Sequence, residues 1–417
     1  MVTIGLIGTG TIGSGVIEIY QKNLKKISNH LKQDVKIKTI CDINFDHCLH
    51  DIREFNKTTN WKDIITDNDI DIVVELIGGE EPAKTIILEA LNHQKHVVTA
   101  NKLVMAKHGK ELLKCASKNG VSIFYEAAVC GAIPIIGPLK TTLVPNNITG
   151  IYGIVNGTTN YILTKMHQED VSYENVLKEA QELGYAEADP SSDVEGFDSQ
   201  YKLAILASIA YQADVNYKDI LVEGITKIAD RDIKYSQEFG KVIKLLAIAN
   251  YKDDKLVLRV HPVLLNKEHP LASVNGVYNA VYVMGDAVGD LMFYGRGAGS
   301  VPTASSIWAD IIDISKGTPY TMDNLKKIKI ASHDTIMSEY YFRIRVIDQP
   351  GVLAGISKIF ANQNISIKTA IQKGLNEDAE LVIITHKVSE RSKNLAAKKI
   401  SELGCVKEVS SIIRVGI

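Results

Sequence analysis

Polar residues that could act on a small substrate gather in three stretches of otherwise apolar sequence, at 99–102, 156–160 and 187–202. Reduction of a carbonyl group needs a hydride donor and a group that gives a proton to the developing alkoxide. A lysine can give that proton when burial or a second cation lowers its pKa. Lys102 and Lys202 are the candidates for this reacting centre, although Lys102 could equally be a solvated lysine at the start of a helix.

Carboxylates in the 187–202 stretch could hold the ammonium group of an amino-acid substrate, and Glu187 and Asp198 are the obvious candidates. We expect a helix to begin near Val194 with Asp193 as its N-cap. Asp198 and Lys202 would then lie four residues apart on one helix face that turns towards the protein interior. The alternative is a structural ion pair on a half-buried helix.

Three glycines, Gly8, Gly10 and Gly13, stand between a predicted strand and a predicted helix. In this context the pattern G-x-G-x-x-G predicts a dinucleotide site, with the pyrophosphate at the helix N-terminus. Asp42 closes the next strand, where it could accept a hydrogen bond from a ribose 2′-OH and would repel a 2′-phosphate. This favours NAD over NADP, with a surface-turn aspartate as the alternative. For the three glycines, the alternative is a turn without a ligand.

Alternating strands and helices position these residues. Strands are expected at 3–7, 35–41, 72–77, 96–100 and 122–127, with helices at 12–27 and 82–91, the latter with Pro82 at its first position. This order predicts an α/β fold with an N-terminal Rossmann-type doubly wound parallel sheet. Lys102 then lies at the carboxyl end of a strand, where such sheets bind ligands.

The remaining chain predicts two further domains. The expected division is 1–131 for dinucleotide binding, with a helix at 303–317 returning to it, 132–302 for substrate binding and dimerisation, 318–338 as a linker, and 339–417 as a regulatory domain. Helices at 173–183 and 196–211 and strands at 256–260 and 280–284 make the second domain α+β. Residues 339–417 show the order βαββαβ, which is typical of a ferredoxin-like fold.

Composition excludes several classes of partner. A chain of 417 residues is too long for a single hydrophobic core and should form two or three domains. With 47 basic and 49 acidic residues, the net charge gives no reason to expect nucleic acid or an anionic membrane as a partner. Five scattered cysteines with no C-x-x-C spacing predict neither disulfides nor a zinc site. With no leader or membrane span expected, we predict a cytoplasmic protein.

Seven stretches together resemble the homoserine dehydrogenases, along essentially the whole chain. They are 5–13, 74–79, 99–102, 126–129, 153–163, 187–202 and 293–305. The resemblance implies the NAD(P)H-dependent, reversible reduction of L-aspartate 4-semialdehyde to L-homoserine, a step of threonine, methionine and isoleucine biosynthesis.

The resemblance also implies roles for single residues. Lys202 would donate the proton, and Lys102 would contact cofactor and substrate at the reacting centre. Homoserine would be bound by residues of the 187–202 stretch, namely Glu187, Asp193 and Asp198. The nucleotide would be lined by Gly8, Gly10, Thr11, Ile12, Gly13, Asp42, Thr99, Lys102, Gly184 and Gly297.

Members of this family hold a sodium-type monovalent cation through backbone carbonyls. Here those would belong to Val129, Gly131 and Ile133, with Glu126 adjacent, and oxygen ligands suit a hard cation. The sequence departs from the family pattern at 130–132, where Cys-Gly-Ala replaces a small residue and two glycines, so the alanine needs a negative φ. A second departure is Asp42 itself, because many relatives place an arginine near the end of this strand.

The last domain resembles an ACT domain at 348–354 and 364–367. In that family, paired domains bind an amino acid at their interface, which here would involve Asp348, Gly351, Asn364 and Ile365. Threonine is the effector that the resemblance implies, and a homodimer or homotetramer is the expected assembly. A dimerisation module without a ligand is the alternative.

Two other readings of the whole chain stay open. One is a catalytically silent sensor of nucleotide and amino acid, which the presence of both lysines and both carboxylates disfavours. The other is an ACT-bearing 2-hydroxyacid dehydrogenase, whose proton transfer relies on a His–Glu pair. No histidine of this sequence is placed for that pair.

Overall fold

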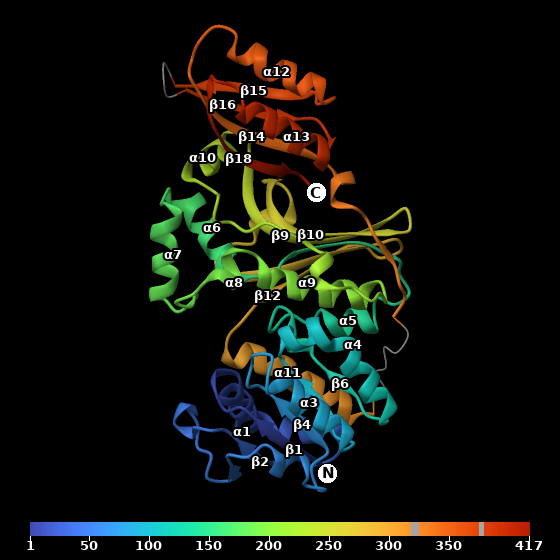
Figure 1. Ribbon diagram of the computed structural model, residues 1–417. Coiled ribbons are helices and arrows are strands. Elements are labelled where there is room, and N and C mark those ends of the chain that lie inside the picture. Colours follow the sequence, from blue (N-terminus) through green and yellow to red (C-terminus); the bar gives the residue numbers. More distant parts are fainter. Residues whose placement is uncertain (318–324, 375–378) are drawn as a thin grey trace. The chain divides into compact units, whose positions relative to one another are not determined.

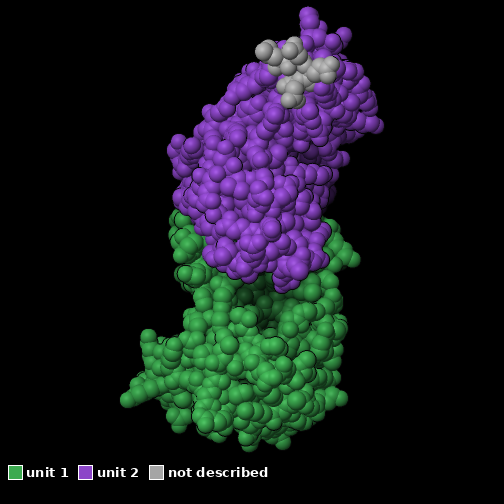
Figure 2. All heavy atoms as spheres, turned by 90° about the vertical axis from the view of Figure 1, so that its left-hand side faces the viewer, with its two compact units in different colours: residues 1–157, 200–220, 278–328 green, residues 158–199, 221–277, 329–417 purple. Residues whose placement is uncertain are grey.

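The structure is a computed structural model that describes residues 1–317, 325–374 and 379–417 (Figure 1). The chain forms two compact units, which Figure 2 distinguishes by colour. Unit 1 contains residues 1–157, 200–220 and 278–328, and unit 2 contains residues 158–199, 221–277 and 329–417. Each unit is assembled from three separate stretches of the chain. The domain boundaries expected at residues 131, 302 and 338 do not coincide with this division and stay predictions.

Unit 1 begins with a six-stranded parallel sheet in the order β3-β2-β1-β4-β5-β6, the doubly wound nucleotide-binding arrangement. The predicted Rossmann-type sheet is confirmed. Its central strands β1 and β4 are buried along their whole length, as expected where helices cover both faces of such a sheet. The elements are β1 (Val2–Ile7), α1 (Thr11–Leu31), β2 (Val35–Cys41), η1 (Phe45–His47), β3 (Asn56–Thr58), α2 (Lys62–Ile65), β4 (Ile72–Glu75), α3 (Ala83–Asn92), β5 (His96–Thr99), α4 (Lys102–Lys118) and β6 (Ile123–Phe124).

Two local expectations in this sheet are corrected. Pro82 is the N-cap of α3 and not its first helical residue. The last strand, expected over 122–127, is only two residues long, because Glu126 begins a 3₁₀ turn, η2 (Glu126–Ala128).

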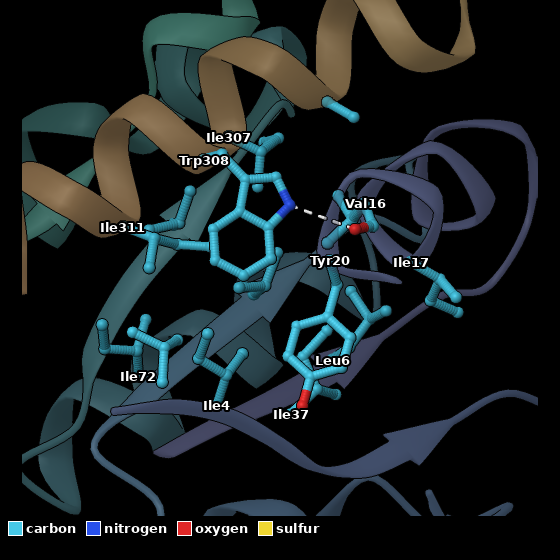
Figure 3. Close-up of a cluster of buried hydrophobic side chains, with 14 of the residues drawn as sticks. Ile4, Leu6, Val16, Ile17, Tyr20, Ile37, Ile72, Ile307, Trp308 and Ile311 are labelled. Carbon is cyan, nitrogen blue, oxygen red and sulfur yellow. Dashed lines mark hydrogen bonds between the residues drawn. The ribbon is translucent and has the colours of Figure 1, made fainter. Parts of the chain in front are cut away.

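Helix α11 (Ser300–Ser315) packs against α1 in the core of this part of unit 1 (Figure 1, orange). Trp308 stacks on Tyr20 with ring centroids 6.2 Å apart, and its indole N–H donates to the carbonyl of Val16 at 3.0 Å (Figure 3). A segment that lies almost 300 residues from α1 in sequence thus completes the nucleotide-binding part of the fold.

The rest of unit 1 contains three antiparallel strands in the order β7-β11-β12, together with short helices and most of α9. These elements are α5 (Ile136–Lys140), β7 (Ile148–Ile154), α9 (Phe197–Ala210), η3 (Tyr217–Asp219), β11 (Tyr278–Gly285) and β12 (Gly289–Arg296).

Unit 2 is built around a long antiparallel hairpin of β9 (Lys241–Lys252) and β10 (Lys255–Asn266). The short strands β8 (Leu221–Val222) and β13 (Lys329–Ile330) pair with β10. Of the expected linker 318–338, residues 318–324 lie outside the described residues, and β13 lies in the remainder. The other elements are α6 (Gly157–Glu169), α7 (Tyr173–Glu182), α8 (Ser191–Val194), α10 (Asp230–Glu238), η4 (Pro270–Ser273) and η5 (His333–Thr335).

The C-terminal part of unit 2 has the predicted βαββαβ order, with strands arranged β18-β14-β16-β15. Side chains alternate between the faces of β14, so Tyr340, Phe342 and Ile344 pack against the helices while Tyr341 and Arg343 point the other way. The elements are β14 (Met337–Val346), α12 (Val352–Asn362), β15 (Ile367–Lys373), β16 (Ala379–Thr385), β17 (Val388–Ser389), α13 (Glu390–Ser401) and β18 (Val406–Val415).

Cysteines and helix composition add two observations. All five cysteines have free thiols. Among the described residues, no helix combines the length and apolar character needed to cross a membrane.

Candidate active site

The glycine turn joins β1 to α1. It is tightly packed at Gly13 and open at Gly10. A β-carbon on Gly13 would lie 2.1 Å from the carbonyl oxygen of Gly8, so only glycine permits this approach. A β-carbon on Gly10 would meet no atom within 4 Å. Gly10 is also the N-cap of α1 and offers no side-chain cap, so the first N–H groups of the helix remain for another acceptor. This arrangement fits a pyrophosphate at the start of α1.

Asp42 is joined to the glycine turn. Its carboxylate accepts hydrogen bonds from the N–H of Thr9 at 2.6 Å and from the Thr9 hydroxyl at 2.8 Å. It also accepts from the N–H of Asn44 at 3.1 Å. Burial alone would raise the pKa of Asp42, but these hydrogen bonds lower it below its usual value. A charged carboxylate therefore anchors the turn, a role that the sequence did not reveal.

A buried acid connects the ends of β4 and β5. Glu75 accepts hydrogen bonds from the Thr99 hydroxyl at 2.7 Å and from the N–H of Ile77 at 2.9 Å. Burial raises the pKa of Glu75 above its usual value. Sequence reasoning missed this residue, and the available signal was an acid inside the apolar run 72–77.

The same network fixes the start of α4. Asn101 caps the helix by accepting from the N–H of Val104 at 3.1 Å, and its amide donates to the carbonyl of Gly79 at 2.7 Å. Its own N–H donates to the Thr99 hydroxyl at 3.0 Å. Lys102, the first residue of α4, is thereby held at the carboxyl edge of the sheet, the edge that also carries the glycine turn.

Lys202 is buried on α9, and its ammonium group donates to the carbonyl of Val155 at 2.7 Å. Asp198, four residues earlier on the same helix, is also buried. The expected start of this helix near Val194 is wrong, because α8 ends at that residue and α9 begins at Phe197. Asp193 accordingly lies in the first turn of α8 instead of capping α9.

The segment after α7 carries the next predicted residues. Gly184 and Glu187 are both exposed. The Gln181 side chain donates to the carbonyl of Glu187 at 3.1 Å, and the Thr158 hydroxyl donates to the carbonyl of Tyr185 at 2.6 Å. The backbone of this turn is therefore held within unit 2, while the Glu187 carboxylate faces solvent.

The predicted cation loop follows η2. Glu126 lies beside this loop, and its carboxylate accepts the N–H groups of Ile135 and Ile136 at 2.7 Å and of Gly137 at 2.5 Å. It thereby caps α5, and burial raises its pKa. The carbonyl of Gly131 accepts from the hydroxyl of Ser306 at 2.7 Å.

The two turn residues of this loop, Cys130 and Gly131, have positive φ angles of 55° and 48°. Ala132 does not have a positive φ, in agreement with the expectation that an alanine at this position needs a negative φ. In the part of the chain that the structure describes, no cluster of three or more His, Cys, Asp or Glu side chains could hold a metal. A cation here would depend on backbone carbonyls.

The predicted effector residues occupy two ends of one helix. Gly351 caps the start of α12 with a φ of 94°, and Asp348 accepts a hydrogen bond from Gln372 at 2.7 Å. Asn364 and the buried Ile365 follow the other end. The 11-residue helix separates them by about 16 Å, at a rise of roughly 1.5 Å per residue. A single bound amino acid would therefore not contact both ends of this helix within one copy of the domain.

Comparisons with known proteins place this geometry in a family. The model for homoserine dehydrogenase matches residues 134–312, that for the homoserine dehydrogenase NAD-binding domain matches 8–126, and that for the ACT domain matches 340–405. A homoserine dehydrogenase of Synechocystis sp. is 45% identical, with 99% of both chains covered.

Solved structures agree with these matches. The crystal structure of a homoserine dehydrogenase from Thiobacillus denitrificans has a TM-score of 0.95 at 39% identity and covers 99% of this chain and 98% of that chain. A hyperthermophilic archaeal homoserine dehydrogenase in complex with NADPH has a TM-score of 0.64 at 28% identity and covers 78% of this chain and 99% of its own. The chain therefore belongs to the homoserine dehydrogenases, a family of oxidoreductases, and carries a C-terminal ACT domain.

Proposed function

We propose that this chain catalyses the reversible reduction of L-aspartate 4-semialdehyde to L-homoserine in threonine, methionine and isoleucine biosynthesis. The observation that carries the proposal is the buried Lys202 on the same helix face as the buried Asp198, in a chain of this family. When bound, the reduced nicotinamide supplies a hydride to the aldehyde carbon. Lys202 donates the proton to the alkoxide oxygen, which completes the alcohol.

The other predicted residues bind and orient the substrate. Lys102, fixed by the cap of α4, would hold the reacting oxygen near the nicotinamide position. Glu187 and Asp198 would bind the substrate ammonium group, with Asp193 beside them. The carboxylates suit this task because an ammonium group is recognised by charged hydrogen-bond acceptors.

Cofactor preference depends on Asp42. Its lowered pKa keeps a negative charge beside the glycine turn, and that charge would repel the 2′-phosphate of NADP. We infer that the enzyme accepts both NAD and NADP and prefers NAD. The NADPH bound to the archaeal relative supports the view that the family fold accommodates the 2′-phosphate.

Three further features complete the proposal. A monovalent cation such as sodium would bind the carbonyls of Val129, Gly131 and Ile133, which the tight turn at 130–131 supports. The ACT domain would bind threonine as a feedback inhibitor in a homodimer or homotetramer, supported by the placement of the effector residues at both ends of α12. A cytoplasmic location agrees with five free cysteines.

One assay of the purified chain tests these statements together. Semialdehyde-dependent oxidation is measured with NADH and with NADPH, in sodium chloride and in choline chloride of equal ionic strength, with and without threonine. We expect turnover with both nucleotides, a higher rate in sodium, and inhibition by threonine. Nucleotide binding without turnover would instead favour the silent sensor. A rate that sodium does not change would refute the cation site alone, and a rate that threonine does not change would refute threonine inhibition alone.

Asp42→Asn separates charge from hydrogen bonding at the nucleotide site. The amide oxygen can still accept from Thr9, but the negative charge is gone. We expect the ratio of kcat/KM for NADPH to that for NADH to rise roughly fivefold, the size of a surface charge interaction of about 1 kcal/mol. A ratio unchanged from the native enzyme would show that Asp42 only anchors the turn.

A further inference from the structure

Arg414, in the last strand of the ACT domain, makes a paired contact with a residue outside that domain. Its two terminal nitrogens donate to the two carboxylate oxygens of Glu223 at 2.7 and 2.9 Å. Arg414 is 3% exposed, while the Glu223 side chain, just after β8, is 41% exposed. This bidentate, charge-assisted geometry fixes both the distance and the orientation of the two side chains.

The ACT domain holds Arg414 from the other side. Glu390, at the start of α13, accepts from Nε of Arg414 at 3.2 Å and from the Tyr340 hydroxyl at 2.7 Å, and it forms ion pairs with Arg414 and Lys393. Burial alone would raise the pKa of Glu390, but the charge of Arg414 lowers it below its usual value. These contacts fix the position of the guanidinium group within the ACT domain, so the position of Glu223 depends on that of Arg414.

From Glu223 the chain makes direct contact with the bend between α8 and α9. The N–H of Ile225 donates to the carbonyl of Val194 at 2.8 Å. A β-carbon on Gly224 would lie 2.2 Å from that same carbonyl oxygen and 2.5 Å from the α-carbon of Glu195. The two backbones touch with no side chain between them, so a shift of 223–225 moves the bend at 194–196.

That bend stands between two of the proposed substrate carboxylates. Asp193 precedes it in α8, and Asp198 follows it in the first turn of α9. Gly196 turns the chain with a φ of 87° and lies against Val222, the residue before Glu223. The relative placement of the two carboxylates thus depends on the segment 222–225.

We propose that Arg414 is a positioning residue for substrate binding: through Glu223 it sets the bend at 194–196 and thereby the spacing of Asp193 and Asp198. This inference rests on the function proposed above. It makes the last strand of the ACT domain part of the support of the substrate site, because that strand reaches the site through two residue contacts. Removal of the pair should weaken substrate binding without altering nucleotide binding.

A second buried cluster provides a matched control. Arg343 of β14 donates to Asp232 of α10 at 2.7 Å and to Glu380 of β16 at 3.0 Å. It is nearly as buried as Arg414, with 6% against 3% of the side chain exposed, and it likewise joins the ACT sheet to the preceding part of unit 2. Its partners lie on α10 and β16 and not in the segment 222–225. Loss of this cluster should lower stability to a similar extent and leave the bend in place.

The experiment compares Arg414→Met, Arg414→Lys, Glu223→Gln and Arg343→Met in the full-length enzyme. For homoserine oxidation, we expect KM for homoserine to rise between about twofold and thirtyfold in Arg414→Met, the range of measured long-range couplings. Arg414→Lys keeps the charge but not the paired geometry, so its KM for homoserine should lie between those of the native enzyme and Arg414→Met. KM for the nucleotide and kcat should stay within about twofold, and Arg343→Met should keep the native KM for homoserine.

Each other outcome has a definite meaning. An unchanged KM for homoserine in Arg414→Met, or an equal rise in Arg343→Met, would overturn the positioning role, the latter because it indicates general loosening of the ACT domain. If Arg414→Met does not fold, Glu223→Gln decides, since its half-exposed side chain can lose charge without burying an unpaired group. A native enzyme that does not oxidise homoserine at all would refute the proposed function, a failure distinct from an active enzyme with an unmoved KM.

Discussion

Lys202→Met is expected to lower kcat for aspartate 4-semialdehyde by about 10³-fold, the middle of the usual range for general acid catalysis. Methionine keeps most of the volume of this buried side chain and removes the amine that donates to Val155. The loss should therefore come from chemistry and not from collapse of α9. The Kd for the nucleotide should stay near the native value, because the glycine turn does not depend on Lys202. Stopped-flow turnover and a fluorescence titration with NADH measure the two quantities.

Lys202→Arg distinguishes a proton donor from a fixed positive charge. A guanidinium group retains the charge but does not give up its proton in the accessible pH range. A proton-donating role predicts that this variant is nearly as slow as Lys202→Met. Recovery of most of the native kcat in Lys202→Arg would assign the residue to charge stabilisation, and a kcat within tenfold of native in Lys202→Met would remove it from the reaction.

Sequence alone predicted the parts of the site that follow local rules. The glycine spacing, the apolar strand before it and the helix after it made the turn at Gly8–Gly13 predictable from local sequence. Asn101 and Lys102 come within three residues of the end of β5, so their place at the sheet edge follows from strand direction. The βαββαβ order of the last domain was likewise readable from alternation and helical periodicity.

Contacts between distant residues could not be predicted. Asp42 binds Thr9 across 33 residues, and Arg414 binds Glu223 across 191, and no sequence pattern connects either pair. The position of Asp42 at a strand end predicted a ribose contact, which stays a prediction, whereas its hydrogen bonds to Thr9 had no signal in the local sequence. The same limit explains why the cap that Glu126 gives to α5 was not predicted, whereas its place beside the cation loop stays a prediction.

Two errors came from proline and glycine within apparently regular segments. The strand expected at 256–260 extends to Asn266, and Pro262 lies within it opposite Leu245. The helix expected from Val194 breaks at Gly196, whose φ of 87° separates α8 from α9. Glycine inside a helical pattern was the available signal for that break.

Gly10→Ala is expected to raise the Kd for NADH and NADPH by about 100-fold without changing the stability of the protein. The added methyl group meets no protein atom within 4 Å, so the free enzyme accommodates it. It would occupy the space in which the backbone approaches the pyrophosphate, and displacements of about 1 Å at such positions can cost two orders of magnitude. Titration of NADH fluorescence measures the Kd, and thermal unfolding measures the stability.

Gly13→Ala is the matched variant at the same turn. Its methyl group would lie 2.1 Å from the carbonyl oxygen of Gly8, so β1 and α1 must separate even before a nucleotide binds. This variant should lose both stability and affinity, whereas Gly10→Ala should lose affinity alone. Equal loss of stability in both would mean that the turn is a structural element of the sheet with no open side. Native affinity in Gly10→Ala would place the pyrophosphate elsewhere. Gly10 is the glycine of this turn at which a β-carbon meets no protein atom, so the free protein itself does not require a glycine there.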